Sequence, residues 1–139
     1  FTTEADVFRG SYAINNWVYN IPGSTTQLWG HPVKPNWRRI SISGFATTEV
    51  PLFMGGWRWG GHPDDSGANH RAPSKMDAHE NGMGRFAMNR HSGRVQATFM
   101  DLSARGVPLK RLWNLQWHRE FDTNAERPKW PAWMAGMPE

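Results

Sequence analysis

His91 and Asp101 are the first two residues of this sequence that could do chemistry together. An imidazole beside a carboxylate can act as a general base, provided that the two groups lie within hydrogen-bonding reach. The residues between them alternate between apolar and polar types, which is typical of a β-strand. A strand would separate the two side chains by about 30 Å, at about 3.3 Å per residue. We therefore predict that each marks a turn, where an aspartate accepts backbone N–H groups.

A second group of polar side chains lies in residues 55–84, the longest stretch without a periodic pattern. A stretch of this length usually forms a loop with a functional or surface role. Carboxylates at such positions could bind Ca²⁺ and imidazoles could bind Zn²⁺, but the spacing matches no defined metal-binding loop. We therefore predict no cofactor, with Ca²⁺ as the alternative. The first candidate ligands are His62, Asp64 and Asp65, and the same loop also holds Asn69, His70, Asp77, His79 and Glu80.

Trp57 and Trp59 lie within a glycine-flanked segment of the same loop. Two bulky indoles exclude a phosphate-binding loop, which needs close approach of the backbone to the phosphates. In an extended segment both indoles would point to the same side. Exposed, they could stack on sugar rings; buried, they would belong to the core or to an interface, as most tryptophans do.

The composition fits one domain of 139 residues with many turns. The sequence has nine Trp, 14 Gly, 10 Pro and no Cys, which excludes disulfides and thiolate metal sites. The net charge of +4 comes from scattered Lys and Arg and predicts no nucleic-acid binding. No stretch approaches the roughly 20 apolar residues of a membrane span. Because the chain begins at Phe1 without Met, we expect a processed or truncated product.

The elements that position these side chains centre on residues 85–107. Apolar residues alternate on both sides of a turn at 91–94, which predicts a three-stranded antiparallel meander with a second turn at 101–103. An apolar run at 50–54 contains Pro51, which predicts an edge strand or the start of one, because proline lacks the N–H that a central strand needs. Leucine and tryptophan at helical spacing, after Pro108, predict an amphipathic helix over 108–118. Residues 119–139 form a Trp- and Pro-rich tail that we expect to pack back on the sheet.

The order of His91, nine residues, and Asp101 resembles the H-x9-DG motif of pilin-like, or type II secretion pseudopilin-like, proteins of planctomycetes and verrucomicrobia. The similarity is most specific over GMGRFAMNRHSGRVQATFMDLSARGVPLKRLWNLQWHREFDTN, residues 82–124. SYAINNWVYN, VPLFMGGWRWGGHPDD and the terminal WPAWM are also similar to segments of that family. The motif's glycine is replaced by Leu102, which resists the left-handed backbone that glycine permits. We therefore expect a different or longer second turn.

This resemblance implies an α+β fold, a pilin-like head whose antiparallel sheet packs on an N-terminal hydrophobic helix that is absent from this sequence. It implies a structural subunit of a filament or pseudopilus at the cell envelope or extracellular surface, working by assembly and not as an enzyme. The implied partners are other pilin-like subunits or a membrane-complex partner, with the membrane reached only through the missing helix. We expect an oligomer whose assembly face includes Phe86, Met88, Val95, Ala97 and Phe99.

Two alternatives to a filament subunit stay open. The first is a surface binding module that uses the Trp-rich loop to hold a carbohydrate or protein ligand. The second is an accessory subunit of a larger membrane complex. An enzyme is not favoured, because no nucleophile and base, and no pair of carboxylates, are brought together by the predicted elements.

Overall fold

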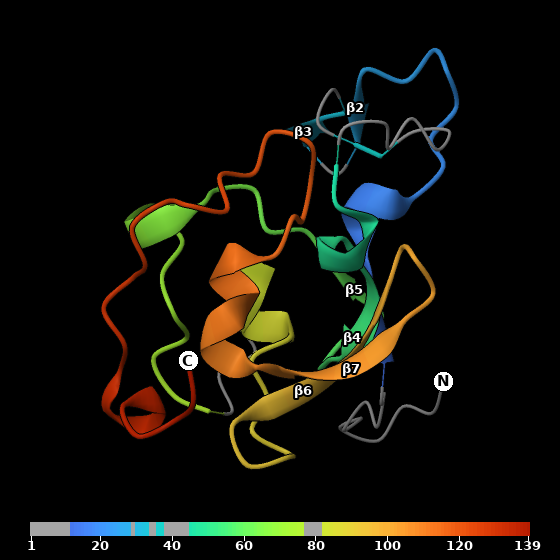
Figure 1. Cartoon of the computed structure of the whole chain (residues 1–139). Coiled ribbons are helices and arrows are strands. Elements are labelled where there is room, and N and C mark those ends of the chain that lie inside the picture. Colours follow the sequence, from blue (N-terminus) through green and yellow to red (C-terminus); the bar gives the residue numbers. More distant parts are fainter. Residues whose placement is uncertain (1–11, 29, 34–35, 38–44, 77–81) are drawn as a thin grey trace, which may run out of the picture.

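Five strands form the main sheet, in the order β5-β1-β4-β6-β7 (Figure 1). The computed structural model describes residues 12–28, 30–33, 36–37, 45–76 and 82–139. The strands of the main sheet are β1 (Tyr12–Asn15), β4 (Pro51–Gly55), β5 (Gly60–Gly61), β6 (Arg94–Phe99) and β7 (Ala104–Pro108). All neighbouring strands are antiparallel except β1 and β5, which are parallel. A separate two-stranded sheet pairs β2 (Gln27–Leu28) with β3 (His31–Pro32).

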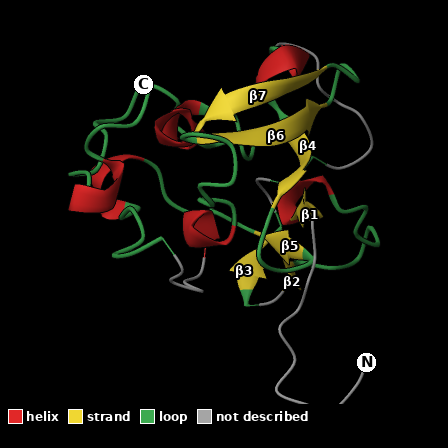
Figure 2. Ribbon diagram, turned by 90° about the horizontal axis from the view of Figure 1, so that it is seen from below, coloured by secondary structure: helices red, strands yellow, loops and turns green. Residues whose placement is uncertain are grey.

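The predicted α+β pilin-like head with a C-terminal amphipathic helix is wrong. The described residues hold a mainly sheet-based core and short 3-10 helices, with no α-helix among them (Figure 2). The 3-10 helices are η1 (Asn16–Val18), η3 (Thr47–Glu49), η4 (Gly67–Asn69), η5 (Gly82–Arg85), η6 (Leu109–Asn114) and η7 (Ala132–Met134). Within the described ranges, no helix has the length and apolar character needed to cross a bilayer.

The segment predicted as a helix over 108–118 forms only η6, which ends where Leu115 turns extended. The carbonyl of Leu112 would accept the backbone N–H of Gln116 in a continuing α-helix. Here the indole of Trp117 donates to that carbonyl at 2.7 Å, and the N–H of Gln116 donates to the Glu49 carbonyl instead. A local bond from the Trp117 indole and a tertiary bond from Gln116 to Glu49 therefore replace the last turn of the predicted helix.

The meander over 85–107 is correct for two of its three strands. β6 and β7 pair as predicted, from Arg94 opposite Pro108 to Thr98 opposite Ala104. The first predicted strand does not form, because Phe86 follows η5 and its N–H donates back to Met83. The other neighbour of β6 is β4, so β4 is a central strand and not the predicted edge. Pro51 is tolerated because it starts β4 at a shift of register.

The two predicted turns flank β6. At the first, Ser92 and Gly93 both have positive φ, and the Arg94 N–H donates to the His91 carbonyl. At the second turn, Leu102 has φ +66°. The expected change of turn type is therefore wrong, because leucine adopts the left-handed backbone conformation that glycine would adopt. Asp101 Oδ1 accepts both the N–H and the hydroxyl of Ser103, which holds the turn closed. These bonds also hold the pKa of Asp101 below its usual range.

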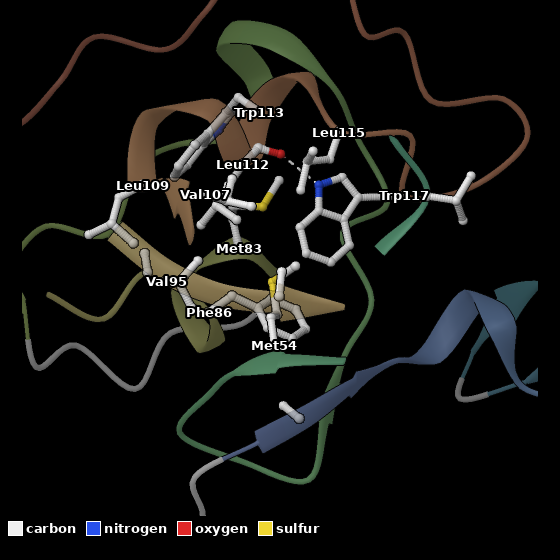
Figure 3. Packing of buried hydrophobic residues seen from close by; sticks show 14 of the residues in the cluster. Met54, Met83, Phe86, Val95, Val107, Leu109, Leu112, Trp113, Leu115 and Trp117 are labelled. Atoms are coloured by element: carbon white, nitrogen blue, oxygen red, sulfur yellow. Dashed lines mark hydrogen bonds between the residues drawn. The ribbon is translucent and has the colours of Figure 1, made fainter. Parts of the chain in front are cut away.

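The inner face of the main sheet is covered by η5 and η6 (Figure 3), and Met134 of the C-terminal tail belongs to the same buried cluster. The five side chains predicted as an assembly face lie on this side and are buried, so they pack within the core instead of meeting a partner: Phe86, Met88, Val95, Ala97 and Phe99. The tail packs mainly on η6, because Trp130 meets Trp113 with ring centroids 5.1 Å apart. Further along, the Trp133 indole donates to the Pro73 carbonyl.

Candidate functional site

A hollow of about 300 Å³ opens at one end of the main sheet. It is lined by Tyr12, Gly55, Met88, Arg90, His91, Val95 and Gln96. Met88 and Val95 are buried and form an apolar floor. An aromatic ring, a guanidinium, an imidazole and an amide therefore surround one recess with an apolar base.

Strand geometry explains how these side chains meet. Tyr12 starts β1 opposite Gly55 of β4, and the residue is 64% exposed. Alternation along β6 buries Val95 and turns Gln96 outward. His91 lies in the turn that precedes β6, so the residue predicted as a turn marker also lines the hollow. Asp101 lies at the other end of β6 and does not.

Trp57 contributes to the hollow indirectly. The Arg90 guanidinium lies over the Trp57 ring, 5.5 Å from its centroid. Trp57 is itself half-buried, and its backbone N–H donates to the Arg85 carbonyl. Trp59 is different, since the residue is 58% exposed. Of the two candidate ligand aromatics, Trp59 is thus open to solvent, whereas Trp57 packs against the Arg90 guanidinium.

A second cluster lies where β3 approaches the end of β5. His31, His62 and Asp64 each offer one metal-ligand atom, and these atoms all lie within 4.8 Å of one another. His31 Nδ1 is 3.4 Å from Asp64 Oδ2, and the two imidazole centroids are 4.9 Å apart. Asp65 is exposed and is not part of the cluster. The sequence therefore identified two of the three members.

Partial burial shapes the electrostatics of this cluster. Burial, and then the nearby charges of His31 and Arg85, lower the pKa of His62 to about 4. Burial also raises the pKa of Asp64. At neutral pH the His62 imidazole is therefore neutral, which is the form that binds a metal. The backbone carbonyl of Asp64 is fixed by the ring of His118, whose Nε2 lies 2.9 Å away.

Sequence reasoning missed His31, Arg90 and Gln96 as site residues. His31 follows a loop of Pro, Gly, Ser and Thr, and only the pairing of β2 with β3 brings it to the His62 side. Arg90 and Gln96 flank the predicted turn. They could have been proposed as site residues if the ends of the hairpin had been considered as possible binding surfaces. Of the other loop candidates, Asp77, His79 and Glu80 lie outside the described residues, and His70 Nε2 accepts the Met83 N–H.

Comparison with protein-family models, with curated proteins and with solved structures finds no match for this chain. The pilin-like family stays a resemblance carried by the sequence motifs. The two sites must therefore be interpreted from their own geometry.

Proposed function

We propose that this domain is a surface-recognition module that binds a carboxylated sugar unit in the hollow at the end of the main sheet. The observation that carries the proposal is the set of side chains around the recess: an exposed Tyr12 ring, the Arg90 cation and the Gln96 amide above an apolar floor. A volume of about 300 Å³ is at the lower end of the range for small-ligand sites.

Each group has a distinct role in such a complex. The face of Tyr12 offers apolar area to the C–H face of a sugar ring, and its rigid side chain loses little entropy on binding. Arg90 offers a planar pair of N–H donors to a carboxylate. Its contact with Trp57 orients it in advance, which lowers the entropic cost of binding. Gln96 offers both a donor and an acceptor to sugar hydroxyls, and His91 adds a ring nitrogen.

The test is calorimetric titration with an oligogalacturonate and with its neutral methyl ester. We expect the carboxylated form to bind and the ester to bind at least about tenfold more weakly, because only a carboxylate pairs with Arg90. Tyr12→Ala and Arg90→Gln should each weaken binding by about tenfold or more. Arg119→Gln, which removes an exposed arginine outside the hollow, is the matched control and should not change it.

Two results would contradict this function. One is the absence of any heat signal with the carboxylated oligosaccharide. The other is equal weakening by Arg90→Gln and Arg119→Gln, which would assign the effect to net charge and not to the hollow.

Assembly with a second copy of the chain is the other candidate function. One observation favours it: Ile14 and Phe53 are opposite residues on the outer face of β1 and β4, and Phe53 is 48% exposed. The resemblance to pilin-like subunits points to contacts between copies, at the cell envelope or extracellular surface, or to a membrane-complex partner. Sedimentation at increasing concentration tests it, since Phe53→Ser should abolish self-association and leave binding of the sugar unchanged.

A further inference from the structure

We propose that His31, His62 and Asp64 bind a divalent metal ion of the zinc class and thereby join the small β2–β3 sheet to the edge of the main sheet. The ligand set of two imidazoles and one carboxylate suits Zn²⁺, whereas Ca²⁺ takes six to eight oxygen ligands. This site is separate from the hollow and does not depend on the sugar-binding function.

The distance between His31 and Asp64 fits metal ligands better than a hydrogen bond. Their nearest side-chain atoms, Nδ1 and Oδ2, are 3.4 Å apart, which is longer than usual for a direct N–H···O bond. Two ligands of a tetrahedral zinc ion, each bound at about 2.1 Å, are separated by about 3.4 Å. Because the three ligand atoms lie within 4.8 Å of one another, the third needs to approach by no more than about 1.4 Å to complete the set.

Asn16 supplies the outer contact that a metal-binding histidine usually has. Its amide lies 3.1 Å from His62 Nδ1, and the residue is 2% exposed. The Asn16 atom in this contact is Nδ2; after a half-turn of the amide, its oxygen would accept a proton from Nδ1, and Nε2 would then be the nitrogen that binds the cation. The nitrogen and oxygen of an amide can be exchanged by a half-turn.

Unsatisfied buried oxygens are the second observation at this site. Oδ1 of Asn16 and Oδ1 of Asp64 are both buried and find no hydrogen-bond partner among the described residues. The half-turn of the Asn16 amide would give its oxygen the Nδ1 proton of His62. A cation would compensate the carboxylate of Asp64. Gly60 keeps space for the amide, because a Cβ there would lie 2.2 Å from Asn16 Oδ1.

The position of the cluster defines what the metal would do. His31 belongs to β3, while His62 and Asp64 directly follow β5. The side chains of His31 and Asp64 are each 36% exposed, so an ion can enter from solvent and keep a water ligand. Behind the cluster, a cavity of about 10 Å³ between the two sheets is lined by His31, His62 and Asn16 among others. One bound ion would therefore hold the two sheets together.

The test is calorimetry of the metal-free full chain with Zn²⁺ alone, with Ca²⁺ as a second titrant. We expect one Zn²⁺ per chain and no Ca²⁺ binding. His31→Ala and Asp64→Asn should each weaken Zn²⁺ binding by about a hundredfold or more, whereas Asp65→Asn, which changes the adjacent exposed carboxylate, should not. Zn²⁺ at a hundredfold excess over its Kd should also raise the unfolding midpoint by about 5 °C or more.

Asp64→Asn preserves the size of the side chain, so it keeps the test valid if His31→Ala fails to fold. The proposal is overturned if Zn²⁺ does not bind in stoichiometric amount. It is equally overturned if Asp64→Asn and Asp65→Asn weaken binding to the same extent, or if Ca²⁺ binds as tightly as Zn²⁺.

Discussion

The body of the protein and its β2–β3 lobe, which we define as the described residues 21–28 and 30–33, are held by different forces. In the body, β6, η5, η6 and the tail close over one apolar cluster, in which Phe86, Trp113 and Trp117 are essentially fully buried. In the lobe, Ile21 and Val33 are buried but lie outside that cluster. The lobe also meets the body through polar side chains, because the His31 and His62 rings lie with their centroids 4.9 Å apart.

This difference indicates which part can open alone. Apolar burial stabilises the body as one cooperative unit, since its strands share a common core. A region with little apolar burial and several polar contacts has a lower local free energy of opening. A ligand that binds between lobe and body would therefore raise the free energy of local opening of the lobe. The predictions below test this division.

The largest effect is expected from Phe86→Ala in the body. The Phe86 ring packs on Trp117 and fills the space above Gly61, so its loss leaves a cavity. We expect the free energy of unfolding to fall by about 3–5 kcal/mol, measured by urea denaturation. Ile21→Ala in the lobe should cost about 1 kcal/mol or less globally, because opening there is local. Equal losses would show that lobe and body unfold as one unit.

A smaller effect is expected from acid, through His70 in the body. Burial lowers the pKa of His70 below 6.5, and its Nε2 accepts the Met83 N–H, so the folded state holds the neutral ring. The unfolded chain binds the proton more readily, so this contribution is complete above pH 6.5 and is lost as pH falls through the folded pKa.

Urea midpoints between pH 7.5 and pH 4.5 measure the contribution of His70. His70→Gln keeps an acceptor for the Met83 N–H but cannot titrate in this range. The loss of stability in acid should therefore be smaller in the variant than in the wild type. His118 also has a lowered pKa and titrates in both proteins, so the difference isolates His70. Identical pH profiles would contradict the assignment.

The smallest effect is a gain, expected from Leu102→Gly in the turn between β6 and β7. Leu102 is 85% exposed and has φ +66°, so glycine relieves backbone strain and removes almost no packing. We expect a gain of about 0.5–1 kcal/mol, after the greater unfolded-state entropy of glycine is included. Leu102→Ala keeps the Cβ and should give no gain. If both variants stabilise equally, exposure of leucine and not backbone strain is the cause.

The part of the fold that could be predicted from sequence is local. Alternation and turn residues placed β6, β7 and both turns, because strand period and turn chemistry act over a few residues. The prediction of a helix over 108–118 was wrong because the Trp117 indole takes the Leu112 carbonyl and the Glu49 carbonyl, distant in sequence, takes the Gln116 N–H. Burial of Phe86 could be foreseen from its apolar type, but its packing against Trp117 and Gly61 could not.

The candidate sites show the same limit. His62 and Asp64 are two residues apart in one loop, so residue type alone suggested them. Their third partner, His31, comes from a different sheet, and no periodic pattern connects the two segments. The hollow likewise joins Tyr12 to Arg90 only because β4 lies between β1 and β6.

Hydrogen exchange of the full chain, with and without Zn²⁺, tests the division between lobe and body most directly. Without metal, we expect amides of the lobe to exchange much faster than those of β6 and β7. At a hundredfold excess of Zn²⁺ over its Kd, exchange in the lobe should slow by up to about a hundredfold, and amides of β6 and β7 should slow only where they exchange through global unfolding. The account is contradicted if lobe and body exchange at the same rate without metal, or if bound Zn²⁺ leaves the lobe unprotected.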